Sequence, residues 1–319
     1  MPKVSVCVPV YSVEKYIERC ARSLFEQTLD DTEFIFVNDC TPDRSVEILE
    51  HVINEYQASL YERKCVAKLY CMSTNNGPGT VRKHAIQLAT GDYITFCDSD
   101  DWMPKDAIEA LYRHAIESDA DIVSGDMQWV YDDGTRTLST LSLPYGNGRE
   151  AVYRALLTKK YSHTLCCKMF KRELLQEHEY ITLQHHTNGE DGMLFYQVLQ
   201  HTNKVIHLNK VVYYYYQNSL SSTHVRLKDL ALARLVDFYN YVVDIPFNNQ
   251  ELIRLAICYS TECINEFAVN QGYARMKKIV MERGSHPYLS FLYRLKYMTL
   301  RQNLRWYAKY VLSTIKQNR

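Results

Sequence analysis

The stretch GDYITFCDSDD (residues 91–101) decides the fold. Its first half is an apolar, β-prone run that predicts a buried strand, Tyr93–Cys97, and its second half carries three carboxylates within four residues. Carboxylates crowded at the end of a buried strand repel one another unless a cation or a helix N-terminus compensates their charge. The stretch therefore predicts either a divalent-metal site or a solvated acidic turn before a helix near Pro104.

Three earlier runs have the same strand-like character. They are Val4–Val10, Glu33–Val37 and Val66–Cys71. Segments with helical spacing separate the four runs, at about 13–27, 43–58 and 79–90. Strands that alternate with helices at this interval predict βαβ units and a mostly parallel sheet flanked by helices. In such sheets ligands bind beyond the carboxyl ends of the strands, which is where the polar motifs of this sequence lie.

The alternation weakens after Asp101. The pattern predicts a helix over about 104–118, a strand Asp121–Tyr131, a turn at 132–134 with a second hairpin strand, helices over 149–158, 168–177 and 190–201, and a strand Val205–Tyr216. From about 227 onward the sequence reads as helix. We therefore predict an α/β domain over residues 1–225 and an all-helical extension over 226–319.

Charge is balanced over the whole chain but not along it. The 319 residues contain 37 Lys+Arg and 37 Asp+Glu, which argues against a uniformly basic nucleic-acid binder. From Arg283 onward there are eight basic residues and no acidic one, so residues 1–282 are net acidic. A basic amphipathic helix is predicted over about 287–316. It would either lie on an anionic membrane surface or pack its apolar side on the preceding helices.

The cysteine content and the hydropathy of the sequence indicate where in the cell the protein is expected to be. The ten cysteines include no C-x-x-C pair, so we interpret them as reduced core residues rather than disulfides or a zinc site. The N-terminal apolar run is too short for a signal peptide, and no stretch of about 18 uninterrupted apolar residues occurs. The expected location is the cytoplasm, either free or peripheral on the inner face of the plasma membrane.

Four motifs follow one another in a fixed order. They are PVYSVE (9–14), VNDCTPDRS (37–45), NGPGTVRK (76–83) and GDYITFCDSDD (91–101). No G-x-G-x-x-G follows the first strand, which disfavours a nicotinamide or flavin enzyme. The series resembles the family 2 glycosyltransferases of the GT-A fold over about the first 105 residues. It departs from the usual family pattern at four positions, which are Asn38, Cys40, Val81 and Lys83.

The resemblance implies an activity and a set of ligands. The activity is metal-dependent, inverting transfer of a hexose or N-acetylhexosamine from a nucleotide sugar, most naturally UDP-linked, to a glycan or lipid-linked acceptor in cell-surface polysaccharide synthesis. Mn²⁺ or Mg²⁺ would be held by Asp98 and Asp100, with His224 as a further ligand. Asp39 would accept the imide N–H of uracil, and Arg82 would lie near the base and diphosphate. The implied donor-binding residues are Pro9, Val10, Tyr11, Glu14, Asp39, Arg82, Asp98, Ser99 and Asp100.

The motif NGEDG (188–192) follows about 90 residues later, at the start of a predicted helix. In the family an acidic pair at this place supplies the general base, so the resemblance nominates Asp191, with Glu190 beside it. Acidic residues also favour helix N-termini for purely structural reasons. Two other functions remain as alternatives. A nucleotidyltransferase would use a similar fold but usually needs a glycine-rich phosphate loop, and a non-catalytic nucleotide-sugar-binding protein would not need Asp191.

Overall fold

The structure is a computed structural model that describes residues 1–139, 143, 146–181, 189–217, 229–271 and 279. The chain divides into two compact units, Met1–His224 and Val225–Arg319. In the second unit the described helices are α8 (Asp229–Asp244) and α9 (Gln250–Gln271), which pack against each other. The basic helix predicted over about 287–316 lies outside the described residues. None of the helices that the structure describes is long and apolar enough to cross a membrane.

The first unit contains the predicted sheet. Its elements in chain order are β1 (Val4–Val10), α1 (Ile17–Phe25), β2 (Thr32–Asn38), α2 (Ser45–Glu62), β3 (Val66–Cys71), α3 (Pro78–Leu88), β4 (Tyr93–Phe96), α4 (Ala107–Ser118), β5 (Ile122–Val130), β6 (Arg136–Ser139), α5 (Arg149–Leu157), β7 (Lys168–Lys171), α6 (Arg172–Gln176), α7 (Glu190–Val198), a 3₁₀ turn (Leu199–His201) and β8 (Val205–Tyr216). The strands form one sheet in the order β3-β2-β1-β4-β7-β5-β6, and β8 pairs with β5. The predicted mostly parallel α/β sheet is therefore confirmed.

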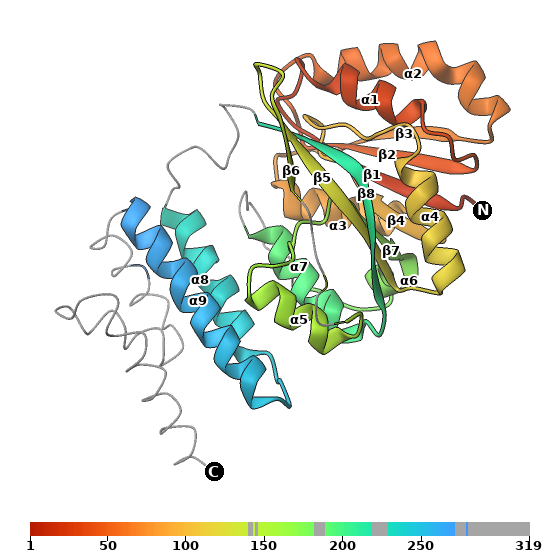
Figure 1. Cartoon of the computed structure of the whole chain (residues 1–319). Coiled ribbons are helices and arrows are strands. Elements are labelled where there is room, and N and C mark those ends of the chain that lie inside the picture. The colour runs from red at the N-terminus through yellow and green to blue at the C-terminus, as the bar shows by residue number, and fades with distance from the viewer. Residues whose placement is uncertain (140–142, 144–145, 182–188, 218–228, 272–278, 280–319) are drawn as a thin grey trace. The chain divides into compact units, whose positions relative to one another are not determined.

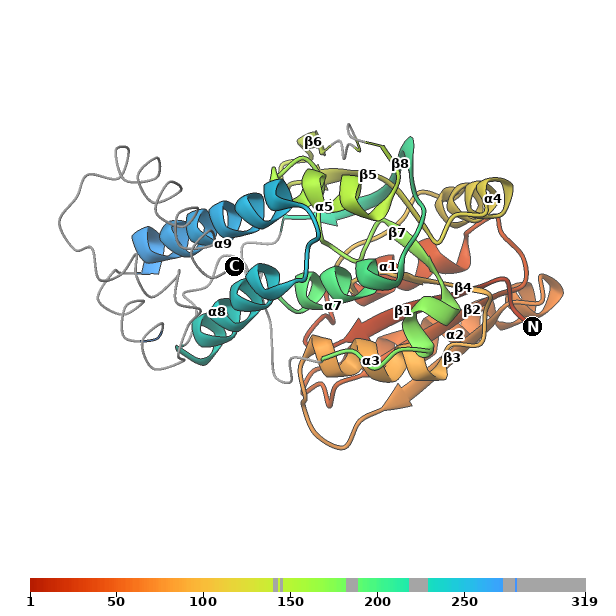
Figure 2. The same cartoon turned by 90° about the horizontal axis from the view of Figure 1, so that it is seen from below.

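Strand order creates a crevice at β1. This strand pairs in parallel with β2 on one side and with β4 on the other. The chain moves from β1 outward to β3 and then returns across β1 to β4. Because such crossovers are right-handed, α1 and α2 cover one face of the sheet and α3 covers the other, as Figures 1 and 2 show. A reversal of this kind leaves a ligand-binding crevice beyond the carboxyl ends of β1 and β4.

The segment 168–177 was predicted to be a helix, and this prediction is wrong for its first half. β7 (Lys168–Lys171) is a strand that pairs antiparallel with both β4 and β5, and only α6 (Arg172–Gln176) is helical. Pairing on both sides and burial on both faces outweigh the weak local preference of so short a segment. Because Met169 lies opposite Thr95 in an antiparallel pair, the residues that precede β7 lie beside those that follow β4.

Candidate functional site

A cavity of about 490 Å³ opens at the crevice between β1 and β4. It takes residues from the ends of these strands, from the N-terminal turns of α3 and α7, and from the loop before β7. Ten of the twelve residues predicted from the sequence line it. They are Pro9, Val10, Tyr11, Asp39, Arg82, Asp98, Ser99, Asp100, Glu190 and Asp191. Motifs separated by up to about 180 residues in sequence therefore meet in one cavity.

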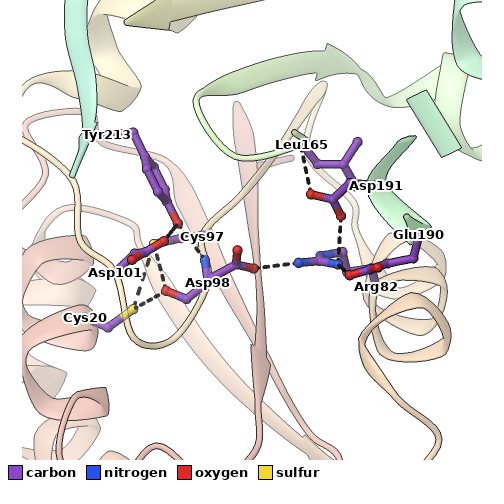
Figure 3. A network of polar contacts seen from close by, with 9 residues as sticks. All are labelled: Cys20, Arg82, Cys97, Asp98, Asp101, Leu165, Glu190, Asp191 and Tyr213. Carbon is purple, nitrogen blue, oxygen red and sulfur yellow. Dashed lines mark hydrogen bonds and ion pairs between the residues drawn. The ribbon is translucent and has the colours of Figure 1, made fainter. Parts of the chain in front are cut away.

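Arg82 is the centre of this cavity. Its guanidinium donates to Oδ1 of Asp98 at 2.7 Å, to Oε1 of Glu190 at 3.2 Å and lies 2.9 Å from Oδ1 of Asp191 (Figure 3). The arginine side chain is only 7% exposed. Burial alone lowers the pKa of Arg82, but the charges of Asp191, Asp98 and Glu190 raise that pKa well above its usual value. One permanent cation thus joins the acidic strand end to the acidic start of α7.

Three carboxylates around one guanidinium leave an excess of negative charge. Burial and the charge of Asp191 raise the pKa of Glu190 to about 7, against the lowering effect of Arg82. Burial also raises the pKa of Asp191, while Arg82 and the Leu165 N–H, 3.3 Å from Oδ2, favour its charged form. Burial and the charge of Asp98 raise the pKa of Asp100 to about 6. Such a site is suited to bind an additional cation.

Replacing Glu190 with Gln is expected to change how thermal stability depends on pH. A carboxyl whose folded pKa is raised binds its proton more readily when folded, so ionising Glu190 costs stability as pH rises from about 4.5 to about 7. The melting temperature of Glu190→Gln relative to wild type should therefore be higher at about pH 8 than at about pH 5. Scanning calorimetry at both pH values measures this, with the exposed Glu50→Gln as control. If the difference in melting temperature between Glu190→Gln and wild type were the same at both pH values, the Glu190 carboxyl would not be buried at a cost when it ionises.

Asp101 is the third carboxylate of the turn formed by residues 98–101. Its side chain does not line the cavity but is held by hydrogen bonds within the protein. Asp101 is 1% exposed, and it accepts hydrogen bonds from the Tyr213 hydroxyl and the Tyr216 N–H, both at 2.7 Å. The Tyr213 hydroxyl in turn accepts the N–H of Asp98 at 3.0 Å. Arg19 donates to the carbonyl of Asp100 at 2.7 Å and stacks on Trp102 at 3.8 Å. These contacts fix the backbone of the turn, so that Asp98 and Asp100 face the cavity.

The residues present fit a divalent cation that is shared with a ligand. Asp98 and Asp100 supply hard oxygen donors, and Arg82 engages one oxygen of Asp98. Among the residues that the structure describes, no group of three or more His, Cys, Asp or Glu side chains is arranged to hold a metal. Mg²⁺ and Mn²⁺ are often bound through one or two carboxylates together with substrate phosphates and water, so two carboxylates are sufficient.

Asp39 also lines the cavity and comes directly after β2. It is 3% exposed, and its two oxygens accept the N–H groups of Asn76 and Gly77, each at 2.8 Å. Gly77 adopts a φ of 82°, which glycine takes without strain, and it is the N-cap residue directly before α3. Asp39 therefore fixes the loop that aims Arg82 into the cavity. Each carboxylate oxygen keeps a second lone pair that can accept a hydrogen bond from a ligand.

Two predicted residues are not brought to the cavity. Glu14 was expected to line the nucleoside pocket, but it is exposed, is absent from the cavity lining, and accepts the N–H of Arg44 at 3.2 Å. The free N–H groups at the start of α2 explain this position, because they attract a nearby carboxylate. His224 lies outside the described residues.

The loop before β7 contributes residues that sequence reasoning missed. His163, Thr164 and Cys166 line the cavity, and Lys168, which is fully buried, donates to the Thr164 carbonyl at 2.6 Å. Burial and the charge of Lys168 lower the pKa of His163 to about 4, so this imidazole is neutral at physiological pH. No motif marks this loop. Only the antiparallel pairing of β7 with β4 would have indicated its position.

The sequence is similar to those of curated glycosyltransferases. The glycosyltransferase GlyA of Streptococcus pneumoniae serotype 4 is 30% identical over 223 residues, which are 67% of this chain and 30% of GlyA. The matched part of the present chain thus spans less than a third of the length of that relative.

Two solved structures share the fold. Staphylococcus aureus TarS in complex with UDP-GlcNAc aligns with a TM-score of 0.71 at 19% identity, over 88% of this chain and 80% of that one. The mannosyltransferase PcManGT from Pyrobaculum calidifontis in complex with GDP-Man and Mn²⁺ aligns with a TM-score of 0.57 at 16% identity, over 99% and 86% of the two chains. These structures confirm the predicted GT-A fold. The model of Glycosyl transferase family 2 matches residues 5–179, more than half of the sequence, and the chain therefore belongs to glycosyltransferase family 2.

Proposed function

We propose that this protein transfers a hexose or N-acetylhexosamine from a UDP-sugar to a hydroxyl of a glycan or lipid-linked acceptor, with Mn²⁺ or Mg²⁺ and with inversion at the anomeric carbon. The observation that carries the proposal is the link through Arg82, whose guanidinium contacts both Asp98 and Asp191. It places a candidate metal ligand and a candidate general base in one cavity. Family membership disfavours the nucleotidyltransferase alternative.

The donor end of the cavity suits a nucleoside. Asp39 has lone pairs left to accept an imide N–H, which uracil offers and most other bases do not. Tyr11, 46% exposed at the cavity edge, presents an aromatic ring on which a base can stack. TarS was solved with UDP-GlcNAc, and this supports a UDP-sugar donor for the present chain.

The residues around Asp98 and Asp100 suit a diphosphate that is bound together with a cation. Asp98 and Asp100 would hold a divalent ion, which when bound would offset the negative charge on the leaving diphosphate. Arg82 contacts the adjacent carboxylates and lowers the pKa of Glu190 and of Asp191 against the raising effect of burial. PcManGT was solved with Mn²⁺ beside its nucleotide sugar, which supports the use of a divalent ion here.

Asp191 is the proposed general base. Arg82 and the Leu165 N–H orient its carboxylate, and the side chain keeps 19% exposure to the cavity. In this position it would take the proton of the acceptor hydroxyl as that oxygen attacks the anomeric carbon. Glu190 is adjacent and more enclosed, at 12% exposure, and we assign it a supporting electrostatic role. We place the reaction at the cytoplasmic side of the membrane, where it would serve cell-surface polysaccharide synthesis.

Thermal stabilisation by nucleotide sugars tests the donor assignment. UDP-GlcNAc or UDP-glucose at 100 times its Kd should stabilise the protein by about 2.7 kcal/mol in the presence of Mn²⁺, and chelation should remove most of this effect. GDP-mannose should stabilise the protein less, because guanine is a purine and does not offer the imide N–H that Asp39 is proposed to accept from uracil. Asp100→Asn should lose the metal-dependent part, whereas the exposed Asp92→Asn should keep it. Equal stabilisation by all donors with and without chelator would contradict the proposal.

A further inference from the structure

Lys168 is a fully buried lysine of β7 that the proposed reaction does not use. Its ammonium donates a hydrogen bond to the Thr164 carbonyl at 2.6 Å, and it lies over the rings of Tyr161 and Phe195, at 5.0 and 5.1 Å from their centroids. Within the described part of the chain it forms no ion pair with a carboxylate. Because burying an ammonium without a counter-ion is costly, packing alone does not explain a charge at this position.

The Thr164 carbonyl belongs to the same peptide group as the Leu165 N–H. That N–H donates to Oδ2 of Asp191 at 3.3 Å, a contact that Figure 3 shows. The described residues include no cis peptide bond, and in a planar trans peptide the C=O and the N–H point in opposite directions. Lys168 and Asp191 therefore lie at opposite ends of one peptide group, with the cation at its oxygen and the carboxylate at its N–H.

Opposite charges at the two ends of this peptide group strengthen both hydrogen bonds. A cation at the carbonyl oxygen polarises the peptide and makes the N–H a stronger donor, and hydrogen bonds linked in this way reinforce one another. Burial raises the pKa of Asp191, while Arg82, the Leu165 N–H and the charge of Lys168 lower it. Leu165 holds one oxygen of this carboxylate, and Arg82 lies 2.9 Å from the other. Lys168 can thus control the orientation of Asp191 through the peptide between them.

We propose that Lys168 is a positioning residue for Asp191, whose ammonium fixes the Thr164–Leu165 peptide so that the Leu165 N–H keeps the carboxylate in one orientation. The proposal rests on the role of general base proposed above for Asp191. It adds to that role a side chain that orients the base from the loop before β7 and from β7 itself.

The Leu165 amide signal tests the contact without any measurement of activity. Lys168→Met removes the charge and keeps a long apolar side chain, and such a replacement of a buried charge is often neutral for folding. In the full chain with isotope-labelled leucine, the Leu165 amide proton should move upfield in Lys168→Met, because its hydrogen bond weakens. It should also move upfield in Asp191→Asn, where the acceptor loses its charge. Lys171→Met is the matched control on the same strand, because Lys171 pairs with Asp119 and does not line the cavity, and it should leave this signal in place.

Kinetics separate positioning of the base from support of the fold. Lys168→Met should lower kcat by about 10- to 100-fold and leave the KM for the donor within about twofold of wild type. In the Asp191→Asn background the same substitution should cause no further loss, because a residue that acts through the base has no effect once the base is gone. Thermal unfolding identifies the folded variants, and Lys168→Gln, which keeps a donor without the charge, replaces Lys168→Met if the latter does not fold.

The proposal is overturned if the folded variant keeps the wild-type Leu165 signal, if it keeps the wild-type kcat, or if the losses multiply in the double variant with Asp191→Asn. A wild-type kcat in Asp191→Asn alone would instead overturn the proposed base. The Leu165 signal would still decide, by itself, whether Lys168 controls the contact with Asp191.

Discussion

Asp191→Asn is expected to lower kcat for sugar transfer by about 10²–10⁴-fold, the usual loss when a general base is removed. Asparagine keeps the size of the side chain and can still accept the Leu165 N–H, but it cannot take a proton. The affinity for UDP with Mn²⁺ should stay within about threefold of wild type, because Asp98 and Asp100 are unchanged. Steady-state kinetics together with titration calorimetry separates these two effects.

The matched control is Asp92→Asn, at an exposed position just before β4. It makes the same chemical change outside the cavity and should leave kcat and UDP affinity unaltered. A wild-type turnover number in Asp191→Asn would remove Asp191 as the base. It would leave Glu190, the adjacent carboxyl with a pKa near 7, as the group to test next.

Arg82→Gln is expected to weaken donor binding strongly and to destabilise the fold by about 3–5 kcal/mol, because it leaves buried carboxylates without their cation. Without the guanidinium, Asp98, Glu190 and Asp191 lose the one described charge that contacts all three. The pKa of Asp191, which Arg82 lowers, should rise. As the pH is lowered, any residual activity of Arg82→Gln should therefore be lost at a higher pH than wild-type activity is.

Chemical denaturation and pH–rate profiles measure these effects. Arg113 offers a contrasting control, since it pairs with Glu109 on α4 but is 68% exposed. Arg113→Gln should cost no more than about 1 kcal/mol and should not move the pH profile. If Arg82→Gln were as mild as Arg113→Gln, the central position assigned to Arg82 would be wrong.

The sequence predicted the part of the site that lies on the regular βαβ framework. Strands β1 to β4 are strongly periodic, and parallel strands carry their following residues to one edge of the sheet, so Tyr11, Asp39 and Asp98 could be expected to meet. The position of Asp191 could not be worked out from periodicity. It depended on the family resemblance, because α7 begins about 90 residues after β4.

The sequence did not predict contacts that depend on long-range pairing. β7 looks helical by itself and becomes a strand only between β4 and β5, so the cavity-lining loop that contains His163 could not be placed. Asp101 likewise looked equivalent to its neighbours. Its burial against Tyr213 follows from β8 lying beside β5, with Tyr213 opposite Met127, a pairing that joins residues about 85 apart in the chain.

The configuration at the anomeric carbon of the released sugar reports directly on a single displacement with inversion. Common UDP-hexoses are α-linked, so real-time proton NMR can identify the anomer that forms first when water or a sugar accepts the glycosyl group. With the UDP-sugar that stabilises the protein most, we predict that the β-product appears first, that release requires Mn²⁺ or Mg²⁺, and that Asp191→Asn stops it. First appearance of the α-product, or release at an unchanged rate after chelation, would contradict a single metal-assisted displacement with Asp191 as base.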